Sequence, residues 1–314
     1  MAHERNAAER PRVAIFGPHP LLTITVERRE DGDDDIHLHA GGQGVWVARM
    51  AGELGAEPVL CGFLGGETGF ALEPLLERLP GSRRLVRTRA RSGCYVQDRR
   101  SGERTLVSAA WSEPPSRHEL DDLFSVTTAA ALDSDVLVVC NPAPGDSLPL
   151  EVYANLVSDV RSNGTPVLVD LSSPRLDSAL RGGPDLVKLN DWELAEYVYG
   201  PVGDPDQLRA AAERLRDAGA HLVVVTRAGE PAFVLARDES WELVPPRFER
   251  GSREGCGDSM MGGLAAAWAA GLGWPEALRR GAAAGAANFL RHGLGSGSRE
   301  VVDELLPRVE LRPG

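Results

Sequence analysis

Several residue types that mark particular protein classes are scarce in this chain. Its 314 residues include only four cysteines, none of them in a CxxC pair, so neither a disulfide framework nor a zinc site is indicated. No apolar run reaches the ~18 residues that a membrane span needs. Residues 1–12 are polar and lack the apolar segment of a signal peptide. We therefore expect a cytoplasmic protein with no membrane partner.

Positive charge is in deficit as well. The chain has 34 lysines and arginines against 46 aspartates and glutamates, a formal net charge of −12. A field of that sign repels nucleic acid, so we expect no nucleic-acid partner. An anionic small molecule is still compatible with the chain where backbone amides and a few arginines offset the field locally.

Two common nucleotide-binding motifs are missing. Nothing in the sequence reads G-x-x-x-x-G-K-[ST], which excludes a Walker loop. Residues 255–257 read Gly-Cys-Gly, but no third glycine and no acidic ribose-binding residue follow. A dinucleotide such as NAD is therefore disfavoured as a cofactor.

Hydrophobic residues make up 42% of the chain, and their pattern changes along the sequence. Residues 21–27 and 36–40 alternate between polar and apolar around an acidic turn, which predicts a hairpin. A second alternating pair covers about residues 92–98 and 104–109. Farther on, short apolar strands stand between helices, at residues 136–140, 167–170, 186–188 and 222–226.

Strands that alternate with helices predict a parallel sheet covered on both faces. Ligands of such sheets lie beyond the carboxyl ends of the strands. We therefore predict an α/β fold with a mostly parallel sheet and a small inserted β lid, formed from about residues 21–40 and 91–110. Residues 1–11 indicate a disordered leader, and residues 12–314 a single domain.

The most informative stretch is Gly255-Cys256-Gly257-Asp258, which a long helix of small residues follows directly. Glycines let successive backbone N–H groups face one concavity, and the helix adds its positive N-terminal pole, so the stretch can bind an anion. An aspartate there can accept a proton from a hydroxyl whose oxygen attacks a phosphorus held by the same amides. The alternative is an aspartate that only caps the helix.

Two strand ends carry further polar residues. Asn190 and Glu193 follow the strand that ends at Lys188, and their spacing places them on one helix face. That arrangement suits a magnesium-bound water near phosphates, whereas the alternative is a capping box. Thr226 and Gly229 follow another strand, where a hydroxyl and exposed amides either touch phosphates or form an ordinary turn.

Nearer the N-terminus, Gly41-Gly42-Gln43-Gly44 opens a helix expected over residues 45–54. A diglycine at a strand-to-helix junction either admits a ligand close to the backbone or makes a tight turn. His37 and His39 alternate along one strand and offer two metal ligands. Because no further ligand stands at a suitable spacing, a solvated lid face is the better interpretation of the two histidines.

Taken in order, these features resemble the PfkB carbohydrate kinase family, which has a ribokinase-like fold with a three-layer core. The resemblance covers about residues 12–310 and includes both family signatures, residues 41–44 through 55 with 62–66, and residues 255–260. Residues 62–69, 102–105 and 258–260 look most like the 1-phosphofructokinase and tagatose-6-phosphate kinase branch.

The resemblance implies an ATP- and Mg²⁺-dependent kinase in which Asp258 is the base and the amides of residues 255–257 hold the transferring phosphoryl group. It assigns to the nucleotide side Lys188, Asn190, Glu193, Thr226, Gly229 and Asn288, with Asn190 and, through water, Glu193 at the Mg²⁺, and Asn288 near the adenine. It assigns to the acceptor side Thr23, Gly41, Gly42, Gln43 and Trp46. The lid is implied to cover the acceptor and to pair two subunits as a homodimer.

The acceptor side departs from the family pattern. Gln43 stands where the family has a lysine, Trp46 where it has an asparagine and Thr23 where it has an aspartate. Gly93 takes the place of a lid arginine that holds a sugar phosphate in the similar branch. Loss of a lysine and an arginine removes two charge-assisted anchors for a phosphate.

We therefore expect phosphorylation of a hydroxyl of a sugar or sugar phosphate, with phosphosugars as poor substrates. One alternative is a kinase of a nucleoside-like or other ring-bearing alcohol that stacks on Trp46. The other is a nucleotide-binding homologue without catalytic activity, against which the intact Asp258 argues.

Overall fold

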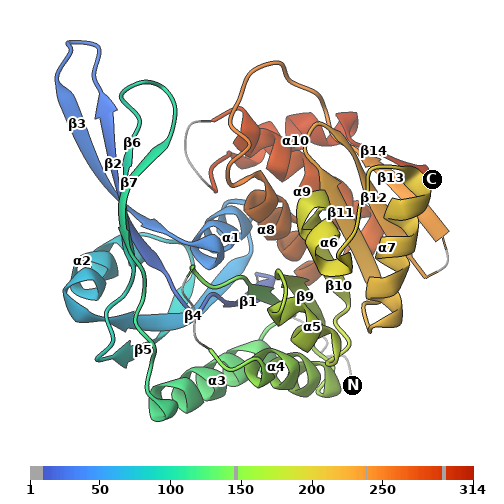
Figure 1. Ribbon diagram of the computed structural model, residues 1–314, viewed down its shortest axis with the longest axis horizontal. Coiled ribbons are helices and arrows are strands. Elements are labelled where there is room, and N and C mark those ends of the chain that lie inside the picture. Colours follow the sequence, from blue (N-terminus) through green and yellow to red (C-terminus); the bar gives the residue numbers. More distant parts are fainter. Residues whose placement is uncertain (1–9, 145–147, 238, 292–294) are drawn as a thin grey trace.

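The computed structural model describes residues 10–144, 148–237, 239–291 and 295–314. The leader predicted over residues 1–11 therefore lies almost entirely outside the described residues. Figure 1 shows a core of one large sheet between helices, from which a smaller sheet projects as a lid. Among the residues just given, no helix is long and apolar enough to cross a membrane.

The large sheet has ten strands in the order β14-β13-β12-β11-β10-β9-β8-β1-β4-β5. From β11 to β5 all neighbours are parallel, whereas β12, β13 and β14 are antiparallel. The parallel strands are β1 (Arg12–Phe16), β4 (Glu57–Gly65), β5 (Ser82–Thr88), β8 (Val136–Cys140), β9 (Val167–Asp170), β10 (Leu186–Asn190) and β11 (Leu222–Arg227). The antiparallel strands are β12 (Glu230–Ala236), β13 (Glu239–Val244) and β14 (Glu310–Pro313).

Helices cover both faces of this sheet because its strands are apolar on both sides. In β1, Val13 and Ile15 join one buried cluster while Ala14 and Phe16 join the other, as the two-residue period of a strand requires. The first cluster packs under α1 (Gln43–Glu53), α2 (Gly66–Leu76), α8 (Cys256–Ala269), α9 (Trp274–Phe289) and α10 (Arg299–Leu305). The second packs under α3 (Arg117–Leu132), α4 (Glu151–Ser162), α5 (Arg175–Leu180), α6 (Asp191–Val198) and α7 (Pro205–Asp217).

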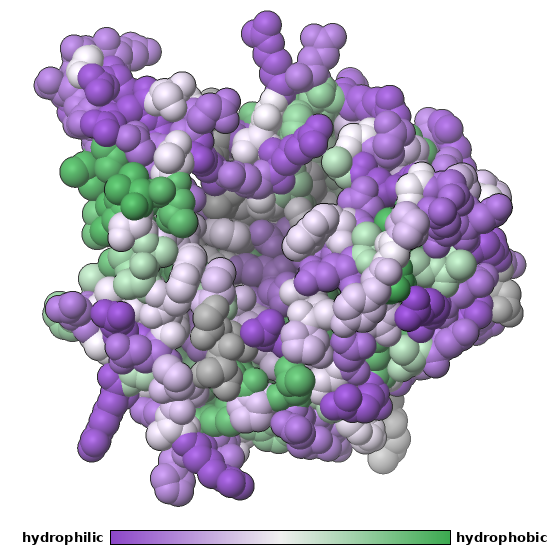
Figure 2. Space-filling view, in the orientation of Figure 1, coloured by the Kyte–Doolittle hydropathy of each residue, from purple (hydrophilic) through white to green (hydrophobic). Residues whose placement is uncertain are grey.

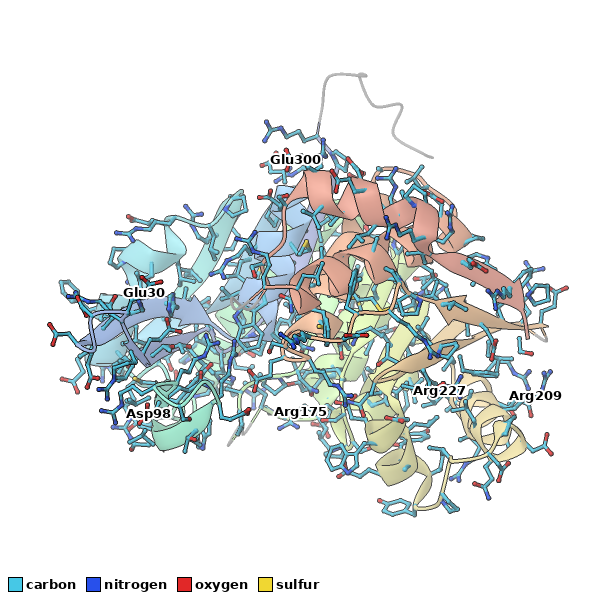
Figure 3. The ribbon with its side chains drawn as sticks, turned by 90° about the horizontal axis from the view of Figure 1, so that it is seen from above. Glu30, Asp98, Arg175, Arg209, Arg227 and Glu300 are labelled. Atoms are coloured by element: carbon cyan, nitrogen blue, oxygen red, sulfur yellow. The ribbon has the colours of Figure 1, made fainter. Side chains whose placement is uncertain are left out.

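The lid is a four-stranded sheet in the order β3-β2-β6-β7. Its strands are β2 (Leu21–Arg28), β3 (Asp34–Gly41), β6 (Cys94–Asp98) and β7 (Thr105–Ala110), so both predicted hairpins are present. The hairpins join through β2 and β6, which are parallel. Figure 3 shows Glu30 and Asp98 on the lid, on the opposite side of the molecule from Arg209.

Sequence patterns gave no prediction for several elements, notably β5, α3 and the hairpin of β12 and β13. Strand β5 reads Ser-Arg-Arg-Leu-Val-Arg-Thr, and only Val86 of it is buried. It lies at the edge of the sheet. Three arginines in seven residues hide the apolar alternation by which a strand is identified.

Parallel strands place their carboxyl ends along one edge of the sheet. Asn141 follows β8, Asp170 ends β9, Asn190 ends β10 and Thr226 lies near the end of β11. The turn that leads into α1 and the start of α8 lie at the same edge, since Gln43 contacts both Asn141 and Asp258. Residues far apart in the sequence are therefore brought together there.

Candidate active site

Helix α8 begins directly at the glycine-rich stretch. Gly255 precedes it with φ 73° and ψ 0°, a left-handed conformation that glycine adopts without strain. Asp258 lies in the first turn of α8. A side chain at Gly257 would place its Cβ 3.1 Å from Nζ of Lys188, so the backbone passes close over that ammonium group. The N-terminus of α8 and the ammonium group of Lys188 each contribute positive charge next to this loop.

Lys188 forms a buried ion pair with Asp170. Its Nζ lies 2.7 Å from Oδ2 of Asp170, and the two side chains are 6% and 4% exposed. Burial by itself lowers the pKa of Lys188, but Asp170, Asp258 and Glu193 outweigh it and raise that pKa above its ordinary value. Lys188 is thus a charged group beneath residues 255–257, which we call the anion loop. Its ion-pair partner Asp170 lies on β9.

The Asp258 carboxyl has a strongly shifted pKa. Burial is the main cause, and with the nearby negative charge of Asp170 it raises the pKa of Asp258 to about 7. Lys188 and a hydrogen bond from Gln43 favour the ionised form and limit the shift. A carboxyl that titrates near neutral pH has the proton affinity that a general base needs there.

Asn190 and Glu193 form the capping box that was the alternative interpretation of their spacing. Oδ1 of Asn190 accepts from the backbone N–H of Glu193 at 2.8 Å, and Oε2 of Glu193 accepts from the backbone N–H of Asn190 at 2.9 Å. Burial and Asp170 raise the pKa of Glu193. Its carboxylate therefore caps α6 and stands close to other negative charge, in surroundings that favour a cation.

The other residues expected on the nucleotide side lie in two places. Oγ1 of Thr226 donates to the carbonyl of Leu189 at 3.4 Å, and Gly229 is exposed in the turn after β11. Asn288 is fully buried, and its amide nitrogen donates to the carbonyl of Glu254 at 2.8 Å. Its oxygen accepts from the backbone N–H of Ser296 at 3.0 Å.

Asn288, which is expected near the adenine, has its amide engaged by the chain itself. Its amide has no exposed surface, and both of its ends are bonded within the protein. It supports the anion loop from behind, where it also contacts Sγ of Cys256 at 3.5 Å. Burial raises the pKa of Cys256, so this thiol is uncharged at neutral pH.

On the acceptor side, Thr23 is buried in the lid, where it lies opposite Tyr95 of β6 in the strand register. Gly41 lies against it, since a Cβ there would be 2.5 Å from Oγ1 of Thr23. Gly42 precedes α1 with φ 100°, which only glycine adopts readily. Trp46 is partly buried and packs against the core cluster under α1, α8 and α9.

Among these residues of the acceptor side, Gln43 is the one whose side chain contacts Asp258. It is the first residue of α1, and its side chain hydrogen-bonds Asp258. Its Oε1 accepts from the backbone N–H of Asn141. The structure therefore joins Gln43 to the proposed base, which its assignment to the acceptor side did not anticipate.

The lid and the anion loop are in direct contact. Arg104, at the start of the last lid strand, places its guanidinium 2.5 Å from Oε2 of Glu254, the residue before Gly255. The Arg104 side chain is 11% exposed. Figure 2 shows the molecule hollowed between the lid and the core.

Several groups in the site were not identified from the sequence, among them Asp170, Asn141, Tyr95 and Arg104. Asp170 and Asn141 carry a usable signal, because each is a polar residue at the carboxyl end of a buried strand. Tyr95 and Arg104 carry none, since an alternating lid strand gives no indication of which residues face the core.

Comparisons with known proteins agree with this geometry. The model of the pfkB family of carbohydrate kinases matches residues 21–300. ATP-dependent 6-phosphofructokinase isozyme 2 of Escherichia coli is 31% identical over 260 residues, which cover 81% of this chain and 82% of that protein. A 1-phosphofructokinase of Rhodobacter capsulatus is 30% identical over 252 residues, 77% of each chain. A crystal structure of a variant of Escherichia coli phosphofructokinase-2 superimposes with a TM-score of 0.82 at 25% identity, covering 95% of this chain and 99% of that one.

The chain therefore belongs to the PfkB family of carbohydrate kinases and has the ribokinase-like α/β fold. It is an ATP-dependent kinase that phosphorylates a hydroxyl of a sugar or sugar phosphate. The family and fold predicted from the sequence are confirmed.

Because the Asp258 carboxyl is buried, we expect the free energy of unfolding to depend on pH. The pKa of this carboxyl is about 7 when folded, against 3.8 as the ordinary value. The group therefore stabilises the fold fully below pH 3.8, and this contribution is lost as the pH rises through about 7. We expect Asp258→Asn to raise the free energy of unfolding at pH 8 by on the order of 2–4 kcal/mol. At pH 4 the two proteins should differ little. Urea titrations at both pH values measure this, and equal stability at pH 8 would contradict the shifted pKa.

Proposed function

We propose that Asp258 is the general base of the kinase reaction. The observation that carries this proposal is its position in the first turn of α8, next to Gln43 and close to the Lys188 ion pair. The Asp258 carboxylate accepts the proton of the acceptor hydroxyl as the hydroxyl oxygen attacks the γ-phosphorus of ATP. The bond from that phosphorus to the leaving oxygen of ADP breaks in line with the attack.

The anion loop stabilises the transferring phosphoryl group in this proposal. The amides of Gly255 and Gly257 face the phosphoryl oxygens, and the pole of α8 adds positive potential. The N–H of Cys256 donates to the carbonyl of Arg253 at 3.3 Å and helps to hold the loop. Lys188 strengthens this potential from below, because its ammonium is charged and lies next to Gly257. Asn288 keeps the loop in place through the carbonyl of Glu254.

ATP and Mg²⁺ belong on the side of β10 and β11 in the same proposal. In the part of the chain that the structure describes, no three His, Cys, Asp or Glu side chains converge as a metal site. Mg²⁺ therefore fits as an ion brought by the phosphates and bound through water, as is common for this ion. Glu193 suits that position, since its carboxylate is held by Asn190 in a negatively charged surrounding. Thr226 and Gly229 border the nucleotide.

Asp258→Asn should lower kcat by several orders of magnitude and leave the affinity for ATP nearly unchanged, because the base acts in the transition state. The wild-type kcat/KM should also fall about tenfold per pH unit below pH 7, since the base must be ionised and its pKa is about 7. Steady-state kinetics from pH 5.5 to 9, together with nucleotide binding by calorimetry, measure both effects. A variant that keeps most of its turnover rules out Asp258 as the base.

We further propose that the preferred acceptor is a sugar without a phosphate of its own. Three cations of this region are paired with carboxylates: Lys188 with Asp170, Arg104 with Glu254 and Arg91 with Glu113. Gln43 and Gly93 add no cation, and a Cβ at Gly93 would lie 2.5 Å from the Leu21 side chain, which would have to shift. A phosphate dianion bound by any of the three paired cations would have to displace its carboxylate partner.

Neutral sugars should be phosphorylated more efficiently than their phosphates. A panel of hexoses, pentoses, nucleosides, fructose 1-phosphate, fructose 6-phosphate and tagatose 6-phosphate measures this, with ADP release as the signal and Asp258→Asn as the blank. We expect kcat/KM for the best neutral acceptor to exceed that for each phosphosugar at least ~10-fold, because an unpaired phosphate is costly to desolvate. Turnover of fructose 1-phosphate or fructose 6-phosphate above ~10⁴ M⁻¹s⁻¹ would falsify this preference.

The lid is also the surface that we propose for pairing two copies of the chain. Strand register places Ile24, Val26, Ile36, Leu38 and Val96 on one face of the lid sheet. Ile36 is 61% exposed and Leu38 48% exposed. Figure 2 shows hydrophobic surface on the lid below its hydrophilic tip. The opposite face carries Thr23 and Tyr95, so a second copy can cover the apolar face without closing the site.

Ile36→Asp and Leu38→Asp should convert a dimer to monomers, because a charge would have to be buried in the apolar interface. Phe70→Asp is the matched control, since Phe70 is 80% exposed on α2, outside the lid sheet. Sedimentation velocity at micromolar concentration measures the mass. The proposal fails if the wild type is monomeric, or if the two lid variants remain dimeric.

A further inference from the structure

The side chain of Gln43 lies between the ends of two elements that are distant in sequence. Its Oε1 accepts a hydrogen bond from the backbone N–H of Asn141, which follows β8. The same side chain hydrogen-bonds Asp258 in the first turn of α8. Gln43 itself is fixed at the first position of α1. One amide therefore connects α1, the end of β8 and α8.

The orientation of this amide is determined by its partners. A backbone N–H only donates, so the oxygen of the Gln43 amide must face Asn141, and its NH₂ group faces the Asp258 carboxylate. Asn141 is held in turn, because its Oδ1 accepts from the backbone N–H of Ser172 at 3.2 Å and from the Ser172 hydroxyl at 3.3 Å. A rotated Gln43 amide would lose its bond to Asn141 and place an oxygen against a carboxylate.

We infer that Gln43 is a positioning residue for Asp258, which it holds through one carboxylate oxygen while the other faces the acceptor hydroxyl. This inference rests on the proposed role of Asp258 as the base. A donor to the carboxylate also favours its ionised form, the form that accepts the proton. Gln43 thus counteracts part of the burial that raises the Asp258 pKa.

A lysine at this position would act differently. Lysine has three donors and no acceptor, so it cannot receive the backbone N–H of Asn141. It would also add a positive charge beside Asp258 and lower the pKa of that group further. The neutral amide keeps the base both oriented and titrating near neutral pH, which a bare positive charge would not do.

Other groups also act on Asp258 and stay unchanged in the test. They come from β8, β9, β10, α6 and the start of α8, and are Cys140, Asp170, Lys188, Glu193 and Cys256. Because substitutions at Gln43 leave all of them in place, a shift in the pH profile reports the change at Gln43.

Three substitutions at Gln43 distinguish the effect of its hydrogen bond to Asn141 from that of its hydrogen bond to Asp258. Gln43→Met keeps the length of the side chain but removes both bonds, and should move the acidic limb of the kcat/KM profile up by about one pH unit. Gln43→Glu keeps an acceptor for Asn141 but places a second carboxylate beside Asp258, and should move the limb higher still. Gln43→Lys should move it below the wild-type position. The expected order of apparent pKa values is therefore Lys, wild type, Met, Glu.

The matched control is Gln207→Met, an exposed glutamine on α7, which should leave the profile unchanged. Thermal unfolding of each variant shows that it is folded. If Asp258→Asn is inactive but the Gln43 variants share the wild-type limb, the inference is wrong and the base assignment stands. If Asp258→Asn is active, the base assignment itself fails. If Gln43→Met does not fold, the other two variants provide the test. A lower apparent pKa for Gln43→Lys together with a higher one for Gln43→Glu supports the positioning role of Gln43. A shift of both apparent pKa values in the same direction overturns it.

Discussion

The buried ammonium of Lys188 is surrounded by more negative charge than it can balance, and much of the site depends on this imbalance. Asp170 lies 2.7 Å away and is its ion-pair partner. Asp258 and Glu193 are close enough to raise the pKa of Lys188 as well. Burial, with the negative charge of Asp170, raises the pKa of Asp258 to about 7, and the single positive charge of Lys188 offsets only part of that shift. The proposed chemistry of Asp258 depends on this affinity for protons.

This arrangement is held by rigid elements rather than by loops. Asp170 and Lys188 are the partners on adjacent parallel strands β9 and β10, and Asp258 is in the first turn of a buried helix. The Asn288 amide ties the loop before that helix to α9. Groups fixed in this way keep their geometry when charge moves during phosphoryl transfer, which is the condition for electrostatic stabilisation of a transition state.

The lid serves two purposes with its two faces. One face carries Thr23 and Tyr95, and Arg104 near the start of β7 reaches Glu254 beside the anion loop. The other face is apolar and partly exposed. In a sheet that alternates with a period of two residues, a single strand such as β2 can supply both surfaces. The proposed pairing of two subunits would therefore use the same element that contributes to the site.

Local sequence patterns determined much of the fold. The four buried strands β8, β9, β10 and β11, the two lid hairpins and the glycine-rich start of α8 all follow from periodicity and turn residues. The Asp258 position was evident for the same reason, because two glycines and a helix start are contiguous in the chain. Family membership followed from the order of these local signals.

The partners of these groups were decided only by the tertiary structure. Gln43 reaches Asp258 across 215 positions of the sequence. Lys188 pairs with a residue on another strand, and the buried Asn288 bonds the carbonyl of Glu254 before α8. No pattern within a segment encodes such contacts, because they depend on which strands become neighbours in the sheet. The order β10-β9-β8-β1 places the ends of four strands and two helices together, and the shifted pKa of Asp258 arises from that placement.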